Sequence, residues 1–550
     1  MKFCFVIGLL VSLAWCAIGW SDDQAVGRSI LSRVELQRNR GNLVIAGEPI
    51  SSRHVLPGLY ERRAHLPVWN QANVDQLLAV IDTSREEGLT PAHYHRRGVF
   101  EYAEFLRRGT GEDERRAEFD ILATDAFIRL AYNLFFGKAD PSELDPDWNT
   151  LRQVQGEDPV AFLQDALDKG RVKTALEELS PHQPYYRRLK TALATYRAIE
   201  AGGGWPRVPD GPTLKPGVRH ARVEVLRQRL AATGDLTEPA GDPALFDDAL
   251  EAAVKAFQKR HRMTADGAVG PATLAALQVP VQARIDQIRV NLERARWMLH
   301  DVPQAFVVVD IAGFEAGYFR EGKLSWRSRV QVGKPYRRTP IFRSEIGYLV
   351  LNPAWTVPPG IEARDILPAV KRNRGYLADR NLSVIDRQGR RIDPAQIDWS
   401  RYSGRNFPYT FRQDPGPDNA LGQIKFMFPN PHFVYLHDTP SKDLFERDVR
   451  AFSSGCIRVE RPLELAELLL NDLEKWSLDR IRMAIDTRKT QTVALPAPVP
   501  VLLYYWTAQG QADGSVHFKN DVYRRDPAVL KALDGEFRFR RQPVTRDRGY

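Results

Sequence analysis

Residues 451–459 read Ala-Phe-Ser-Ser-Gly-Cys-Ile-Arg-Val, and Glu-Arg-Pro follows directly at 460–462. The small residues before Cys456 let the backbone turn sharply and aim amide groups at a reacting carbonyl. Pro462 predicts the start of a helix, because a proline in the first helical turn costs no backbone hydrogen bond. The stretch therefore predicts a tight turn that presents a cysteine, followed by a helix.

A strand that carries a histidine is expected shortly before this turn. Residues 430–437 read Asn-Pro-His-Phe-Val-Tyr-Leu-His, and an alternation of period two places Phe433, Tyr435 and His437 on one face. His432 then points to the opposite face, so the two histidines do not form a metal pair, and we expect neither a metal nor a cofactor. A cysteine, a histidine within reach and backbone donors are the groups that acyl transfer requires.

Four segments around these residues resemble the catalytic domain of the L,D-transpeptidases. They are Arg-Gln-Asp-Pro-Gly-Pro-Asp-Asn-Ala-Leu-Gly at 412–422, Lys-Phe-Met-Phe-Pro-Asn at 425–430, Tyr-Leu-His-Asp-Thr-Pro at 435–440 and Ser-Ser-Gly-Cys-Ile-Arg at 453–458. The resemblance implies a mostly β fold in which Cys456 is the nucleophile. It also implies that His437 is the general acid and base, with its ring oriented by a backbone carbonyl.

The same resemblance suggests roles for the neighbours of Cys456. The amides of Gly455 and Cys456 are candidates for the oxyanion hole, and Arg458, Tyr435 and Ser454 are candidates for binding substrate. Ser454 stands where many members of the family have histidine, and a structural salt bridge is the alternative role for Arg458. Because the flanking arginines and His437 favour a thiolate, we expect the pKa of Cys456 to lie below that of a free thiol.

A second resemblance lies upstream. Residues 266–273 read Asp-Gly-Ala-Val-Gly-Pro-Ala-Thr, and helical patterns precede and follow this turn within 218–280. The unit resembles the three-helix peptidoglycan-binding domain. Before it, nine of the seventeen residues in 201–217 are Gly or Pro, a composition that predicts a linker.

The rest of the chain predicts a multidomain α+β protein. Helical periodicity at Val74–Ile81 and Phe119–Ala131 predicts a helical scaffold domain over about 28–200. The mostly β catalytic domain is expected over 300–490, with a long polar and aromatic insertion at about 357–418 that we interpret as a lid. Residues 491–550 are left as a C-terminal extension.

The N-terminus predicts export. Residues 1–20 carry one basic residue and then an apolar stretch, which is typical of a signal peptide or, if retained, of an inner-membrane anchor. Cys4 and Cys16 lie inside this segment, so Cys456 is the only cysteine beyond it. The chain has 78 basic and 69 acidic residues, a balance that suits polyanionic partners, but export to the periplasm argues against nucleic acid.

These features together predict a periplasmic L,D-transpeptidase of cell-wall biogenesis and cell shape. The resemblance implies that Cys456 forms a thioester with a tetrapeptide stem of peptidoglycan, releases D-Ala, and passes the acyl group to a second stem as a 3→3 crosslink. It also implies that carbapenems acylate Cys456. Two alternatives stay open: an L,D-carboxypeptidase or endopeptidase that uses water as acceptor, and a wall-binding scaffold without catalytic activity.

Overall fold

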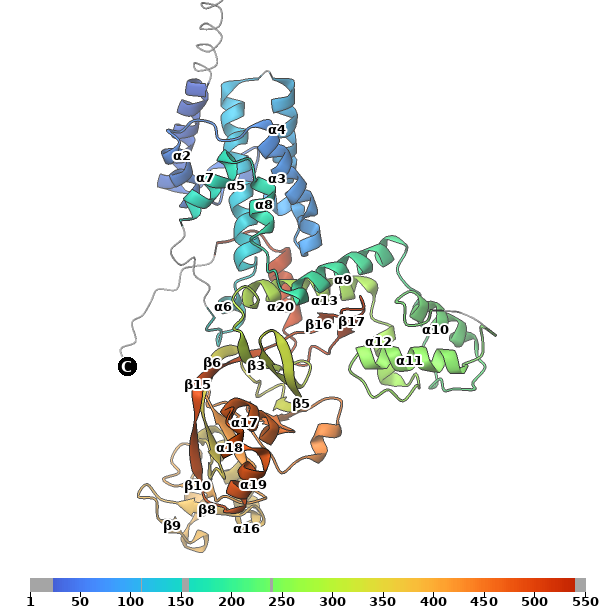
Figure 1. Cartoon of the computed structure of the whole chain (residues 1–550), viewed down its shortest axis with the longest axis vertical. Coiled ribbons are helices and arrows are strands. Elements are labelled where there is room, and N and C mark those ends of the chain that lie inside the picture. Colours follow the sequence, from blue (N-terminus) through green and yellow to red (C-terminus); the bar gives the residue numbers. More distant parts are fainter. Residues whose placement is uncertain (1–22, 110, 151–157, 238–240, 540–550) are drawn as a thin grey trace, which may run out of the picture.

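The computed structural model describes residues 23–109, 111–150, 158–237 and 241–539 of the chain (Figure 1). The predicted signal segment at 1–20 and the end of the C-terminal extension at 540–550 lie outside the described residues. The described part confirms a multidomain α+β protein with a helical N-terminal region, a three-helix unit and a mostly β domain. No helix in these ranges combines the length and the apolar character needed to cross a membrane.

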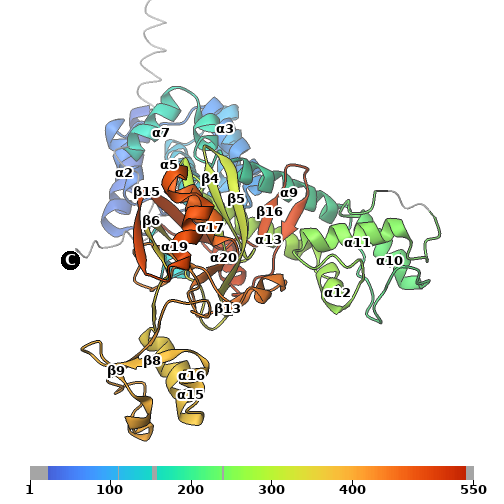
Figure 2. The ribbon, with the colours of Figure 1, turned by 60° about the horizontal axis from the view of Figure 1, so that its bottom comes forward.

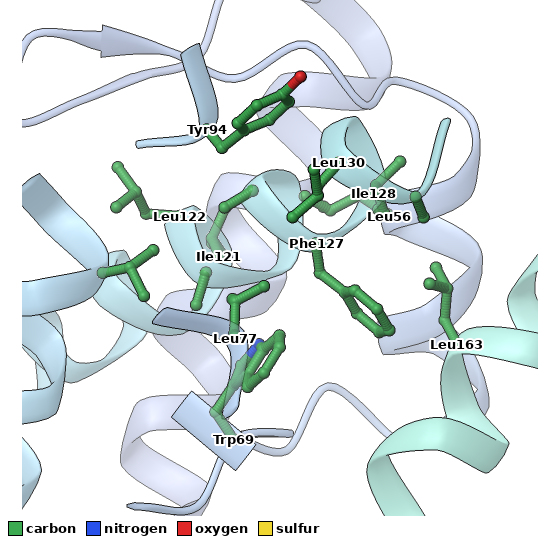
Figure 3. Packing of buried hydrophobic residues seen from close by; sticks show 14 of the residues in the cluster. Leu56, Trp69, Leu77, Tyr94, Ile121, Leu122, Phe127, Ile128, Leu130 and Leu163 are labelled. Atoms are coloured by element: carbon green, nitrogen blue, oxygen red, sulfur yellow. The ribbon is translucent and has the colours of Figure 1, made fainter. Parts of the chain in front are cut away.

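The N-terminal region is a helical bundle around the long helix α5. Phe127 of α5 lies between Trp69 and Leu163, and its ring meets that of Trp69 edge to face at 5.8 Å (Figure 3). The bundle comprises a helix over 23–40, a small hairpin of β1 (Val44–Ile45) and β2 (Glu48–Pro49), and the helices α2 (Val55–Arg62), α3 (Gln71–Thr83), η1 (Ser84–Glu87), η2 (Pro91–Tyr94), α4 (Arg96–Arg108), α5 (Asp113–Phe136), α6 (Pro141–Leu144), α7 (Pro159–Asp168) and α8 (Val172–Glu177).

Two long helices, α9 (Pro184–Ala201) and α13 (Val281–Met298), pack together and lead to the three-helix unit (Figures 1 and 2). That unit consists of α10 (Ala221–Ala231), α11 (Asp248–Arg260) and α12 (Pro271–Leu277). The expected linker at 201–217 is partly wrong, because Val208 and Leu214 are buried in the core of this unit. Arg222 also donates hydrogen bonds to two backbone carbonyls of the segment. The segment 201–217 is therefore packed against the three-helix unit and is not a flexible linker.

The mostly β domain is built on a nine-stranded sheet of the described residues, in the order β13-β5-β14-β12-β11-β6-β15-β3-β4. Strand β5 also pairs with β4, which closes the sheet on itself. The strands are β3 (Ala305–Asp310), β4 (Glu315–Arg320), β5 (Lys323–Gly333), β6 (Phe342–Leu351), β11 (Ile424–Met427), β12 (Leu436–His437), β13 (Ala451–Ser453), β14 (Ile457–Val459) and β15 (Gln491–Tyr504), with η6 (Asp443–Glu446) before β13 and the helices α17 (Pro462–Leu470), α18 (Leu473–Trp476) and α19 (Leu478–Asp486) after β14.

The insertion at about 357–418 folds as a small subdomain that projects from one end of the sheet (Figure 2). It has its own apolar core, in which Trp399 stacks near Phe411, and a four-stranded sheet in the order β7-β10-β8-β9. Its elements are β7 (Trp355–Thr356), α14 (Pro359–Ile361), η3 (Glu362–Ile366), α15 (Leu367–Arg372), α16 (Tyr376–Asp379), β8 (Leu382–Ile385), β9 (Arg391–Ile392), η4 (Pro394–Gln396), η5 (Trp399–Arg401) and β10 (Thr410–Gln413). We call it the insertion subdomain.

The residues beyond 490 connect the sheet to the helical bundle. Strand β15 lies between β6 and β3, so the expected boundary at 491 falls at the start of a central strand. The chain then forms the hairpin of β16 (Ala508–Gly510) and β17 (Val516–Phe518) and the helix α20 (Asp526–Asp534). Leu533 of α20 is buried in the core of the N-terminal bundle, where Lys138 donates hydrogen bonds to the carbonyls of Leu533 and Gly535.

We expect Leu533→Ala to lower the free energy of unfolding of the helical bundle by about 2–5 kcal/mol, because it removes a fully buried side chain and leaves a cavity. Calorimetry of the full chain measures this as a lower transition temperature. Leu473→Ala is the matched control, since Leu473 is 69% exposed and its truncation should change stability by no more than about 0.5 kcal/mol. Equal effects of the two substitutions would mean that α20 is not part of the bundle core.

Candidate active site

The pairing of adjacent strands sets the side chains around Cys456 in one row. Gln331 of β5 pairs with Arg458 of β14, Arg458 pairs with His437 of β12, and His437 pairs with Lys425 of β11. Directly paired residues project from the same face of a sheet, so these four side chains are neighbours. Cys456 lies two residues before Arg458 and therefore belongs to the same face.

The opposite face of these strands is apolar. Phe426, Leu436 and Ile457 are fully buried in the core of the closed sheet. Alternation between this core and the polar face is what places His437 beside the cysteine-bearing strand.

The strand predicted over 430–437 is mostly wrong, since only Leu436 and His437 pair as strand β12. The Asn430 carboxamide accepts hydrogen bonds from the amides of His432 and Val434, which replaces a ladder by a local turn. Phe433 adopts a left-handed φ of 55° and is 70% exposed. Tyr435 and His437 keep the predicted common face, whereas Phe433 does not share it.

His437 is 3% exposed, and its Nδ1 donates to the backbone carbonyl of Asp438. This contact confirms the expectation that a carbonyl orients the ring. Asp438 is itself fixed, since its carboxylate accepts from the Gln423 amide and from Lys442. Gly422 lies against that carboxylate with a φ of 60°, and a Cβ there would come within 2.4 Å of Asp438 Oδ2.

Burial, and then the positive charges of Arg458 and Lys425, lower the pKa of His437 to about 3. The imidazole is therefore neutral at neutral pH and can accept a proton. The Leu421 backbone also interacts with the ring and acts in the opposite direction on its pKa.

Cys456 is partly exposed, and its Sγ donates to the Phe433 carbonyl at 3.7 Å. Within the described part of the chain, no hydrogen bond joins this thiol to His437. Burial raises the pKa of the Cys456 thiol, although the Tyr435 backbone, Lys425 and Arg458 act in the opposite direction. The expectation of a pKa below that of a free thiol is therefore wrong. The loss of hydration around Sγ outweighs the nearby cations, and the resting pair is a thiol and a neutral imidazole.

The turn before Cys456 has a fixed hydrogen-bond pattern. Gly455, with a φ of 122°, donates its amide to the Ser453 hydroxyl, which in turn donates to the Cys456 carbonyl. The Gly455 amide would have to leave Ser453 before it could bind an oxyanion. No described residue accepts a hydrogen bond from the Cys456 amide, so of the two predicted donors this one is free.

Ser454 connects the turn to the insertion subdomain. Its hydroxyl accepts a hydrogen bond of 2.9 Å from Arg337, and the same guanidinium forms a two-point ion pair with Asp365 of η3, with Nη2 2.8 Å from Oδ1. Ser454 is thus a contact of Arg337 in this structure. The sequence contains no signal for this contact, because the three residues come from distant segments.

Arg458 and Tyr435 both lie beside Cys456. The Arg458 guanidinium donates to Gln331 Oε1 at 3.2 Å and forms no ion pair with any described carboxylate, so the alternative of a structural salt bridge is not observed. The ammonium of Lys425 lies over the Tyr435 ring, with Nζ 3.8 Å from the ring centroid. Sequence reasoning missed Lys425, although it begins one of the four segments that resemble the family.

A cavity of about 490 Å³ lies between the insertion subdomain and the sheet. Arg458, Thr439 and Ser441 line it from the sheet, and Trp355, Tyr376 and Arg380 line it from the subdomain. Arg458 belongs to both the cavity and the row of Cys456, whereas Cys456 and His437 do not line the cavity.

The C-terminal segment supports the cysteine turn from behind. The Tyr523 hydroxyl donates to the Gly333 carbonyl at 2.6 Å and accepts from the Thr339 amide at 3.2 Å. The Thr339 hydroxyl then donates to the Gly455 carbonyl at 2.8 Å. One chain of hydrogen bonds thus runs from the extension to the residue before Cys456.

We expect Tyr523→Phe to increase hydrogen–deuterium exchange at 333–339 and 453–457 about tenfold, because a lost buried hydrogen bond costs about 1–3 kcal/mol of local stability. Mass spectrometry of peptic peptides measures the change. Tyr336→Phe is the control, since Tyr336 is 73% exposed. Unchanged exchange in the Tyr523 variant would show that the extension does not support the turn.

We expect the rate of Cys456 alkylation by iodoacetamide to rise with pH at a midpoint above about 8.5, the value of a free cysteine. The direction follows from the raised pKa of the thiol. Lys425→Met should move the midpoint further up, because it removes a cation that favours the thiolate, whereas the exposed Lys475→Met should not. A midpoint at or below 8.5 in the unsubstituted protein would contradict the raised pKa of the thiol.

Comparison with protein-family models matches three stretches of the chain. Residues 54–193 match the scaffold domain, residues 219–277 match a domain described as "Putative peptidoglycan binding domain", and residues 304–495 match the L,D-transpeptidase catalytic domain. These stretches correspond to the helical bundle with α9, the three-helix unit and the closed sheet with its insertion subdomain.

Two curated proteins share sequence with the chain. A Haemophilus influenzae protein named "Putative L,D-transpeptidase" is 40% identical over 223 residues, which is 40% of this chain and 45% of that protein. An N-acetylmuramoyl-L-alanine amidase of Mycobacterium tuberculosis is 40% identical over 81 residues, which is 13% of this chain and 20% of that protein. The chain thus spans less than half the length of either relative.

Solved structures are more distant. An L,D-transpeptidase from Mycobacterium smegmatis is 13% identical with a TM-score of 0.19, covering 36% of this chain and 58% of that one. An L,D-transpeptidase from Stackebrandtia nassauensis is 14% identical with a TM-score of 0.21, covering 54% and 96%. The family matches and the curated relative carry the identification: the chain contains an L,D-transpeptidase catalytic domain and a peptidoglycan-binding domain, joined to a helical scaffold domain.

Proposed function

We propose that the chain is a periplasmic L,D-transpeptidase that forms 3→3 crosslinks in peptidoglycan through a thioester on Cys456. The observation that carries the proposal is the pairing of β12 with β14, which puts His437 next to the cysteine-bearing strand inside the matched catalytic domain. Export rests on the signal-like residues 1–20, and retention of that segment would add an inner-membrane anchor.

The first half of the reaction makes the thioester. Cys456 Sγ leaves the Phe433 carbonyl, turns to the neutral His437 imidazole and gives up its proton as the S–C bond forms at the stem carbonyl. His437 then passes this proton to the amide nitrogen, the C–N bond breaks, and D-Ala departs as a free amine. The free Cys456 amide is the first donor available to the oxyanion.

The second half reverses the roles. An amine of a second stem attacks the thioester and His437 takes the proton that this nitrogen releases. As the amide C–N bond forms the C–S bond breaks, and His437 returns the proton to sulfur, which restores the thiol. Water in place of the amine would give carboxypeptidase activity from the same thioester. Arg458 and the cavity under the insertion subdomain are the groups that we assign to holding a stem during these steps.

The three-helix unit is proposed to hold the enzyme on its polymer substrate. Arg262 forms an ion pair of 2.8 Å with Glu315 of β4, and Thr264 bonds with Asp448 near β13, so the unit contacts the catalytic domain directly. Binding of glycan or stem by this unit would raise the local concentration of further stems near Cys456.

We expect purified protein to release D-Ala from a tetrapeptide stem, and to form a dimeric product only when an acceptor stem is added. Cys456→Ala should lower D-Ala release by at least about a thousandfold, since it removes the proposed nucleophile. A carbapenem should leave one covalent adduct by intact-mass spectrometry in the unsubstituted protein and none in Cys456→Ala. Release without any crosslinked product would identify a carboxypeptidase, and no release at all would favour a non-catalytic wall-binding role.

A further inference from the structure

Lys425 lies in the row of side chains around Cys456, but neither the sequence motif nor the proposed reaction assigns a role to it. It pairs with His437 in the ladder, and its ammonium lies over the face of Tyr435. No described residue accepts a hydrogen bond from Nζ or forms an ion pair with it. An ammonium has three N–H donors, and an aromatic face satisfies it only in part.

The charge balance of this face is unusual. Lys425 and Arg458 are both partly buried, both interact electrostatically with the Cys456 side chain, and neither has a carboxylate partner among the described residues. Cys456 and His437 between them are neutral in the resting state. Cations that have lost part of their hydration are normally paired, because removing water from an uncompensated charge is costly. The site therefore has an excess of positive charge that an anionic ligand would balance.

We propose that Lys425 binds the terminal carboxylate of the departing D-Ala, and so restricts the enzyme to stems that end one residue after the scissile bond. This inference rests on the function proposed above. In such a stem the carboxylate carbon is three bonds from the attacked carbonyl carbon, at most about 4 Å away. A carboxylate held this close to Sγ falls within the region whose charge Lys425 already influences.

Lys425 is a better candidate for this contact than Arg458. The Arg458 guanidinium is already bound to Gln331, whose carboxamide is fixed by a second hydrogen bond to the Ser441 carbonyl. Arg458 also faces the cavity under the insertion subdomain, on the other side of His437 from Lys425. The two cations can thus hold different parts of a stem, with Lys425 on the side of the leaving residue.

The test compares two tetrapeptide donors that differ only at the C-terminus, one with a free D-Ala carboxylate and one with D-alaninamide. We expect the unsubstituted protein to prefer the free acid about tenfold to hundredfold in kcat/KM, the range of a charge-assisted hydrogen bond. Lys425→Met should abolish the preference, because it loses more activity on the acid than on the amide, and Lys425→Arg should restore part of the preference. Lys475→Met, a substitution of an exposed lysine on α18, should keep the full preference.

The outcomes separate this inference from the proposed function. If the unsubstituted protein releases nothing from either donor, the proposed function fails. If it acts on the acid and the amide equally well, or if Lys425→Met keeps the preference, the enzyme stands and the carboxylate contact is overturned. A purely structural or purely electrostatic role of Lys425 would lower both activities by the same factor and leave their ratio unchanged, which also overturns it.

Discussion

Everything near Cys456 depends on the parallel pairing of two very short strands, β12 and β14. Two pairs of residues fix this register, and a shift by one would turn His437 into the apolar core and Leu436 out of it. The shifted register would bury the imidazole in an apolar core and expose the leucine, and both changes are unfavourable. The observed register is therefore favoured, although the ladder itself is short. The same register buries the ring of His437 and sets Arg458 and Lys425 on either side of it, and burial, followed by these charges, lowers its pKa.

The second constraint on the site comes from far along the chain. Tyr523 reaches the turn of Cys456 through Gly333 and Thr339, and three residues later α20 begins and enters the core of the helical scaffold. The scaffold, the C-terminal segment and the cysteine turn are thus connected by packed and hydrogen-bonded groups. The buried Leu533 is the point at which this C-terminal segment enters the scaffold core.

Sequence reasoning succeeded where local patterns decide the structure. The long helices, the three-helix unit and the β-rich domain follow from periodicity and turn chemistry, and the carbonyl that orients His437 was expected from the family. Sequence reasoning failed where contacts between residues far apart in the sequence determine the local structure. The apolar side chains Val208 and Leu214 turn a Gly- and Pro-rich stretch into packed chain, and the Asn430 side chain replaces most of a predicted strand by a turn.

The missed role of Lys425 and the wrong prediction for the pKa of the Cys456 thiol also come from contacts between distant segments. Lys425 is separated from Cys456 by 31 residues, and only the pairing of β11, β12 and β14 makes them neighbours. The arginines beside Cys456 in sequence suggested an acidic thiol, but sequence does not reveal how much water the fold removes from Sγ. Desolvation and nearby cations act in opposite directions, and their balance is a property of the folded site.

The balance between desolvation and nearby cations at Sγ determines at which stage of the proposed reaction the cations are stabilising. In the resting site the thiol and the imidazole are neutral, so the fields of Lys425 and Arg458 stabilise little. Negative charge develops on sulfur and on the stem oxygen only as the reaction proceeds, and at that stage both cations and the free Cys456 amide become favourable. Interactions that strengthen between ground state and transition state are those that accelerate a reaction. A site that already held a stable thiolate would have used the same cations in the resting state and would gain less from them in the transition state.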